Sequence, residues 1–126
     1  MHVLLVFLGG GLGAALRHGV NLLALRTVGI AFPYGTLCIN VAGSLLMGVL
    51  AAWFVRHGEV SAGTRLFLAT GVLGGFTTFS AFSLETVLLV ERGQAGLAAV
   101  YVAASVVLSV AALFAGMALV RGAWPA

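Results

Sequence analysis

Hydroxyl and amide side chains recur every four residues in two apolar segments of this chain. Tyr101, Ser105 and Ser109 follow this spacing, so on a helix they lie on one face and form a line about 12 Å long at 1.5 Å rise per residue. A second set with the same spacing lies in an earlier segment: Thr36, Asn40 and Ser44. Single Ser or Thr residues in apolar helices commonly bond a neighbouring helix, but two aligned sets in so short a chain favour a polar pathway.

The segment TGVLGGFTTFSAFS, residues 70 to 83, predicts a break in a helix. Gly74 and Gly75 are poor helix formers, and Thr77 and Thr78, which follow them, are β-branched. Unwound backbone inside an apolar span is tolerated only where it is buried in protein or lines a cavity. Because hard cations prefer oxygen ligands, the freed carbonyls of Gly74 and Thr77 are candidates to bind a cation.

Phe79 and Phe82 follow the expected break at a spacing of three and share a helical face. Such pairs are usually core packing, but the edge of a phenyl ring carries the positive part of its quadrupole. Together with hydroxyls and the Asn40 amide, which donate hydrogen bonds, these rings can address an anion without a fixed positive charge. Weak neutral donors of this kind suit conduction, because a conducted ion must also be able to leave its site.

The composition requires that these groups are positioned by membrane helices. The chain has 126 residues, of which 62% are apolar and only 7% are charged, which is too little charge for the surface of a soluble domain and excludes most cytoplasmic enzymes. A membrane helix takes about 20 apolar residues, so the chain predicts a single, all-α membrane domain of four transmembrane helices with the break in the third. The expected spans are 3–25, 34–55, 66–90 and 95–120, with residues 56–65 as a loop and both termini on one side of the membrane.

The basic residues are six arginines placed singly, so no basic stripe exists for nucleic acid despite the pI near 10. If the N-terminus is inside, the inner regions hold three arginines, at positions 56, 65 and 121, and the outer ones hold two, at 26 and 92. This split gives little orientation by the positive-inside rule, and we expect insertion both ways round. Oppositely inserted copies can form an antiparallel, dual-topology homodimer; the alternative is a single orientation set by other features.

Glycines at a spacing of four, such as Gly9 with Gly13, predict close helix packing in lipid. The run Gly9, Gly11, Ala14 also fits a dinucleotide-binding pattern, but that motif needs an acid about 20 residues later, and the first acid is Glu59. The single cysteine, Cys38, lies in an apolar run, and we expect its side chain to be buried.

Three segments of the chain resemble the signature segments of the Fluc (CrcB) family of fluoride channels. They are GGGLGAALRH at 9–18, GTLCINVAGSLLMG at 35–48 and TGVLGGFTTFSAFSLE at 70–85. The resemblance spans all four helices, and the third motif is highly specific. It implies a passive, fluoride-selective channel in the bacterial inner membrane, assembled as an antiparallel homodimer with two pores, that exports cytoplasmic fluoride and reduces its toxicity.

The resemblance also implies roles for individual residues. The fluoride pore would be formed by Asn40, Phe79, Phe82, Tyr101, Ser105 and Ser109. Arg17 would place positive charge toward an aqueous vestibule, and the carbonyls of Gly74 and Thr77 from both subunits would enclose a structural sodium ion (Na+) on the dimer axis. Glu85 matches the family's acid, and its expected partners are Thr or Ser hydroxyls.

Two other function classes remain open at this point. A small dual-topology, proton-coupled exporter of cationic compounds needs a titratable carboxylate in its path, and Glu85 is the only candidate within a span. A noncatalytic membrane assembly subunit would leave the aligned hydroxyls and the broken helix without a purpose.

Overall fold

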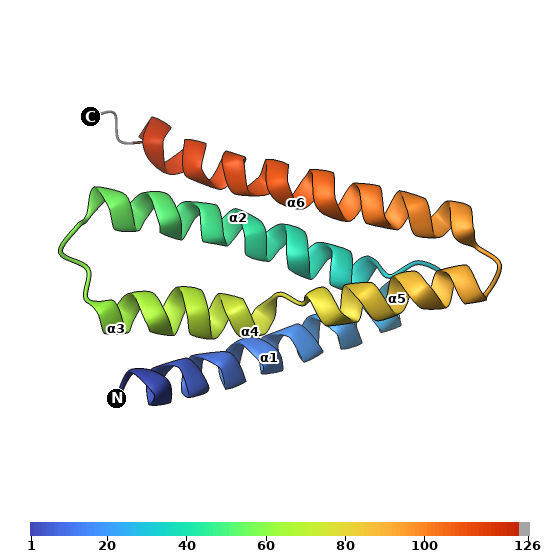
Figure 1. The fold of residues 1–126 in the computed structure, drawn as a ribbon, viewed down its shortest axis with the longest axis horizontal. Coiled ribbons are helices and arrows are strands. Elements are labelled where there is room, and N and C mark those ends of the chain that lie inside the picture. The colour runs from blue at the N-terminus through green and yellow to red at the C-terminus, as the bar shows by residue number, and fades with distance from the viewer. Residues whose placement is uncertain (124–126) are drawn as a thin grey trace.

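The computed structural model describes residues 1–123, which form four helical spans and contain no β-strand (Figure 1). The spans are α1 (His2–Thr27), α2 (Tyr34–Arg56), a composite third span, and α6 (Ala95–Ala123). The third span consists of α3 (Ala62–Arg65), η1 (Leu66–Leu73), α4 (Gly74–Phe76) and α5 (Phe79–Glu91). All four are long and apolar enough to cross a membrane, which confirms the predicted all-α membrane class. The beginning of α1 and the end of α6 lie at the same end of the bundle (Figure 1).

The helices form two closely packed pairs: α2 packs along α6, and α1 packs along η1 and α4. Glycines lie at both contacts, as their spacing predicts. A Cβ added to Gly48 on α2 would come within 3.0 Å of the Leu113 carbonyl carbon on α6. A Cβ on Gly9 of α1 would come within 3.0 Å of the Gly71 Cα on η1. Because backbone meets backbone at these points, only glycine fits, and helix association without a hydrophobic driving force depends on such close packing.

Large apolar side chains cover the outside of the bundle. Phe7 is 73% exposed and Phe114 is 68% exposed, which suits contact with lipid rather than water. The prediction that Cys38 is buried is wrong, because its side chain is exposed. The inner face of α2 contains Thr36, Ile39 and Gly43, and residue 38 lies on a different side of that helix.

The connection between the second and third spans is shorter than predicted. Residues 56–65 were expected to form a loop, but α2 continues to Arg56 and α3 already begins at Ala62. The early helix start has a local cause, since the Ser61 hydroxyl oxygen accepts a hydrogen bond from the Thr64 N–H at 3.2 Å, as an N-cap residue does. The Arg65 Nε–H donates to the Val60 carbonyl at 3.3 Å and stabilises the connection between α2 and α3.

The third span is irregular on both sides of its centre. Leu66–Leu73 form a π-helix, in which the Gly74 N–H reaches back to the Ala69 carbonyl, and such segments often mark functional sites. After α4 the helix stops, and both Thr77 (ψ 155°) and Thr78 (ψ 118°) are extended. Figure 1 shows this break as a short stretch of thin coil between α4 and α5. It falls within the segment predicted from the Gly and Thr pattern.

Candidate functional site: a neutral groove at a broken helix

The break in the third span is held by the side-chain amide of Asn40. Its Nδ2 donates to the Thr78 carbonyl at 3.0 Å, and its Oδ1 accepts from the Thr78 N–H at 2.9 Å. The Thr78 hydroxyl in turn accepts from the Ala81 N–H at 3.1 Å and caps α5. Asn40 therefore bonds both polar groups of one unwound residue, and its second Nδ2 hydrogen is left to donate elsewhere.

These bonds redirect two donors that a continuous helix would use. A helical Thr78 N–H would donate to the Gly74 carbonyl, and a helical Ala81 N–H would donate to the Thr77 carbonyl. In this chain the two donors go to Asn40 and to the Thr78 hydroxyl instead. The carbonyls of Gly74 and Thr77, which the sequence singled out, have thus lost their regular helical partners.

A groove of about 380 Å³ runs beside the break, between α2, the third span and α6. Its polar lining comes from Asn40, Ser44, Thr77, Thr78, Ser105 and Ser109. None of the described residues that line it is charged. The hydroxyls of Ser105 and Ser109 are buried and have no hydrogen-bond partner within residues 1–123. Unpaired buried hydroxyls are costly, so this groove is suited to a ligand that accepts hydrogen bonds.

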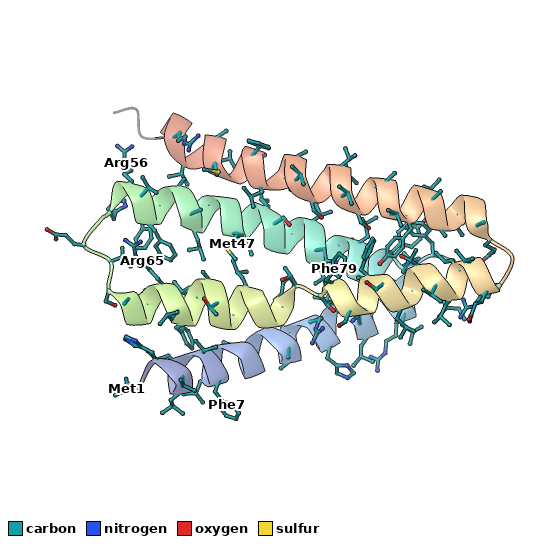
Figure 2. All side chains as sticks on the ribbon, in the orientation of Figure 1. Met1, Phe7, Met47, Arg56, Arg65 and Phe79 are labelled. Atoms are coloured by element: carbon teal, nitrogen blue, oxygen red, sulfur yellow. The ribbon has the colours of Figure 1, made fainter. Side chains whose placement is uncertain are left out.

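The two predicted phenylalanines lie at the mouth of this groove. Phe79 is 79% exposed, and Figure 2 shows it beside the break, with Met47 of the same groove further along α2. The Phe79 and Phe82 ring centroids are 5.5 Å apart, and Phe82 lies 5.2 Å from the fully buried ring of Tyr101. A series of aromatic contacts thus links the break to the buried face of α6.

Tyr101 belongs to a polar network beyond the groove. Its hydroxyl donates to Glu85 Oε2 at 2.7 Å, and the Thr36 hydroxyl donates to Glu85 Oε1 at 2.8 Å. The network joins α2, α5 and α6 at one carboxylate. The expectation that Glu85 partners Thr or Ser hydroxyls near its helix end is confirmed only for the residue type of Thr36, because the second partner is Tyr101 and the two partners lie 49 and 16 residues away.

The structure brings most of the predicted site residues together, but not all of them. Asn40, Thr77, Phe79, Phe82, Ser105 and Ser109 share the groove. The Tyr101 ring packs against the Phe82 ring but does not line the groove. Gly74 is the first residue of α4, the short helix before the break. Arg17, half-buried on α1, does not line the groove, and its vestibule role stays a prediction. Sequence reasoning gave no central role to Thr78 or Glu85; the available signal was that Glu85 is the only acid inside a span.

A metal site built from side chains is not present in the described part of the chain, where no three His, Cys, Asp or Glu residues gather. Any cation bound near the break must therefore use carbonyl or hydroxyl oxygens, and the predicted Gly74 and Thr77 carbonyls are among those that have lost their helical donors.

Comparisons with a family model and with individual proteins all indicate the same family. The family model described as "CrcB-like protein, Camphor Resistance (CrcB)" matches residues 4–117. The chain is 59% identical over 121 residues to the fluoride-specific ion channel FluC 2 of Nitrobacter hamburgensis, covering 96% of this chain and 98% of that protein. It is 60% identical over 121 residues to the fluoride-specific ion channel FluC of Rhodopseudomonas palustris (strain BisB5), with the same coverage. The FluC of Novosphingobium aromaticivorans is 58% identical over 119 residues, covering 93% of this chain and 94% of that protein.

The matched region begins in α1 and ends in α6, so it contains all four spans, the break and every groove residue described above. The family match, the identities and the four apolar helices agree that this is a multi-pass bacterial membrane protein and that the chain belongs to the CrcB family.

Proposed function

We propose that this chain forms a passive, fluoride-selective ion channel. The observation that carries the proposal is the uncharged groove, in which the hydroxyls of Ser105 and Ser109 are buried without a partner. Its relatives are named fluoride-specific ion channels, and fluoride is a small anion that accepts hydrogen bonds. The proton-coupled exporter of cationic compounds finds no support among these relatives.

The groove favours an anion because the polar groups that still lack a partner there can donate hydrogen bonds. Ser105 and Ser109 each carry a hydroxyl hydrogen, and the Asn40 amide retains one N–H after bonding Thr78. Phe79 and Phe82 add positively polarised ring edges. A small, strongly hydrated anion needs such donors to replace its water, and donors without full charge let it leave again.

Two copies in antiparallel, dual-topology arrangement would complete the site. A phenyl ring that is 79% exposed at a polar groove, as Phe79 is, leaves one side of the site open in a single chain. The nearly even distribution of arginines between the two ends allows both orientations. Figure 2 shows Arg56 and Arg65 at the end where the chain begins, and Arg26 and Arg92 lie near the opposite end. These features support a homodimer about a two-fold axis in the membrane plane.

A structural Na+ on the dimer axis is supported by the Gly74 and Thr77 carbonyls, which are among those that lost their helical donors at the break. One chain offers the oxygens of Gly74 and Thr77, and a second copy would double that set to a cage of hard ligands. When bound, the ion would hold the two broken helices together. Protein prepared with an organic cation in place of Na+ should lose fluoride flux and regain it when Na+ is added; flux that is independent of Na+ would contradict this site.

Passive transport is sufficient for export. Fluoride enters as the neutral acid and is trapped as the anion, and an inside-negative potential drives an anion outward by about 2.3 kcal/mol per 100 mV. A selective pore in the bacterial inner membrane would therefore lower cytoplasmic fluoride and its toxicity.

Fluoride efflux from liposomes tests the function directly. Purified protein is reconstituted in vesicles loaded with potassium fluoride, and external fluoride is followed with an electrode after a potassium ionophore is added. We expect efflux that continues when the pH gradient is collapsed, and vesicles loaded with chloride serve as the matched control. Absent efflux, or efflux that stops without a proton gradient, would overturn the channel proposal, and the second result would favour the exporter.

A further inference from the structure

A second polar cavity lies at the opposite end of the bundle from the beginning of the chain. It has a volume of about 350 Å³ and is bounded by the connection between α1 and α2 and by the last turns of α5. Its lining includes Asn21, Phe32, Thr36, Glu85, Leu89 and Arg92. Because the exposed connection around Gly29 and Ile30 forms its rim, this cavity opens toward water rather than toward the bilayer centre.

The cavity is separated from the groove by the Tyr101–Glu85 hydrogen bond. Glu85 lines the cavity, and its Oε2 accepts from the Tyr101 hydroxyl at 2.7 Å. Ser105, one helical turn from Tyr101, lines the groove. The two polar spaces therefore lie on either side of one buried tyrosine, and a route along the hydroxyls of α6 toward this end would reach the second cavity after passing Tyr101.

The charges around this cavity are arranged along one face of α5. Glu85, Leu89 and Arg92 are spaced four and three residues apart and lie on one side of the helix. Arg92 is exposed, and its side chain makes no hydrogen bond or ion pair with another residue of the described chain. Seven residues correspond to about 10 Å along the helix, so the guanidinium stands nearer the water than the carboxylate does.

Without Arg92, the cavity would present a net negative charge to an approaching anion. Glu85 would repel the ion, and the neighbouring Glu91 lies about 100° around the helix and does not line the cavity. Arg92 is the one cation among the described lining residues. Clefts with a charge of one sign at the rim raise the local concentration of the opposite ion.

We propose that this cavity is the second mouth of the conduction route, taking small inorganic anions, and that Arg92 is the residue that attracts them. The inference rests on the proposed function, since it assigns an entrance to the same route. Arg92 acts at a distance on entry and does not ligate the ion in the groove, so its effect depends on ionic strength.

Arg92→Gln tests this role, with Arg26→Gln as the matched control. Both changes remove one exposed arginine near the same end of the bundle, but Arg26 does not line the cavity. Fluoride flux is measured in liposomes at about 0.01 M ionic strength, where charges act over about 30 Å, and at about 1 M with an impermeant salt, where they act over about 3 Å.

We expect Arg92→Gln to lower the flux about two- to tenfold at low ionic strength and to match the unsubstituted chain at high ionic strength. Arg92→Glu should lower it further, Arg92→Lys should restore it, and Arg26→Gln, which does not line the cavity, should lower it by less than Arg92→Gln does. Equal fluxes for the Gln variants at positions 92 and 26, or a loss that persists at high ionic strength, would overturn the inference. Increased fluoride flux in Arg92→Glu would show that Arg92 retains the anion instead of speeding its entry, and would also overturn it. Failure of the unsubstituted chain to conduct fluoride would instead refute the proposed function.

Discussion

Asn40→Asp changes one nitrogen to an oxygen at the centre of the broken helix, and we expect it to abolish fluoride conduction. The Nδ2–H that donates to the Thr78 carbonyl at 3.0 Å would be replaced by a carboxylate oxygen facing that carbonyl. The Oδ1 that accepts from the Thr78 N–H would be kept. The variant therefore loses one of two bonds that hold the break and places a negative charge beside the anion route.

The two consequences differ in size. Loss of one buried hydrogen bond costs about 1–3 kcal/mol, which a packed membrane bundle can tolerate. A carboxylate about 4 Å from a conducted anion repels it by about 4 kcal/mol at an effective dielectric constant of ~20, which lowers ion occupancy about a thousandfold. The electrostatic effect dominates, so the variant should still assemble but conduct no fluoride.

The assay is fluoride efflux from liposomes at neutral pH, together with size-exclusion chromatography to show assembly. Cys38→Ser is the matched control, because Cys38 is exposed on the same helix, two residues before Asn40, and lines neither polar space. It should conduct within about twofold of the unsubstituted chain. Near-normal flux in Asn40→Asp would refute the placement of the anion route, and equal loss in Cys38→Ser would refute the assignment of the loss to the charge at position 40.

Three further outcomes are expected. Phe79→Ile should slow or stop fluoride flux while the protein still assembles, because the ring is 79% exposed and contributes little to the packing of its own chain; full flux would show that its ring edge is not used. Gly48→Ala should destabilise the bundle by about 1–3 kcal/mol, measured as a lower melting temperature in detergent, since its Cβ would press on the Leu113 backbone; Gly11→Ala, which meets no atom within 4 Å, is the control and should be neutral. A cysteine at Glu59 in a chain lacking the native one should be labelled from both sides of the membrane, and one-sided labelling would exclude dual insertion.

The parts of the fold that could be predicted are those determined locally. Four apolar stretches give four spans whatever the tertiary structure is, and the Gly74, Gly75, Thr77, Thr78 cluster weakens its own helix. The π-helix of η1 could not be predicted, because a change from four- to five-residue hydrogen bonding leaves the hydropathy pattern unchanged. The Ser61 cap was visible in the sequence, yet the polar run around it concealed a helix start.

The parts of the site that could not be predicted depend on contacts between distant segments. The spacing suggested that Asn40 donates to an ion, whereas in the structure most of its amide is bonded to Thr78, which lies 38 residues away. Glu85 could be seen as an isolated acid, but its pairing with Thr36 and Tyr101 requires three helices to converge. A residue type indicates what a side chain can donate, and only the packing shows which of its hydrogens are already used.

The hydrogens still available limit how one chain can serve an anion. Both hydroxyl hydrogens at Glu85, from Thr36 and Tyr101, are directed to its carboxylate oxygens, so in this arrangement Tyr101 has no hydrogen left for the ion. Ser105, Ser109 and one N–H of Asn40 remain. Three neutral donors replace the water of a small, strongly hydrated anion only in part, and ring edges alone are weaker than hydrogen bonds. The shortfall is the physical reason to expect a second copy at the groove, where its own aromatic edges would complete the set of donors.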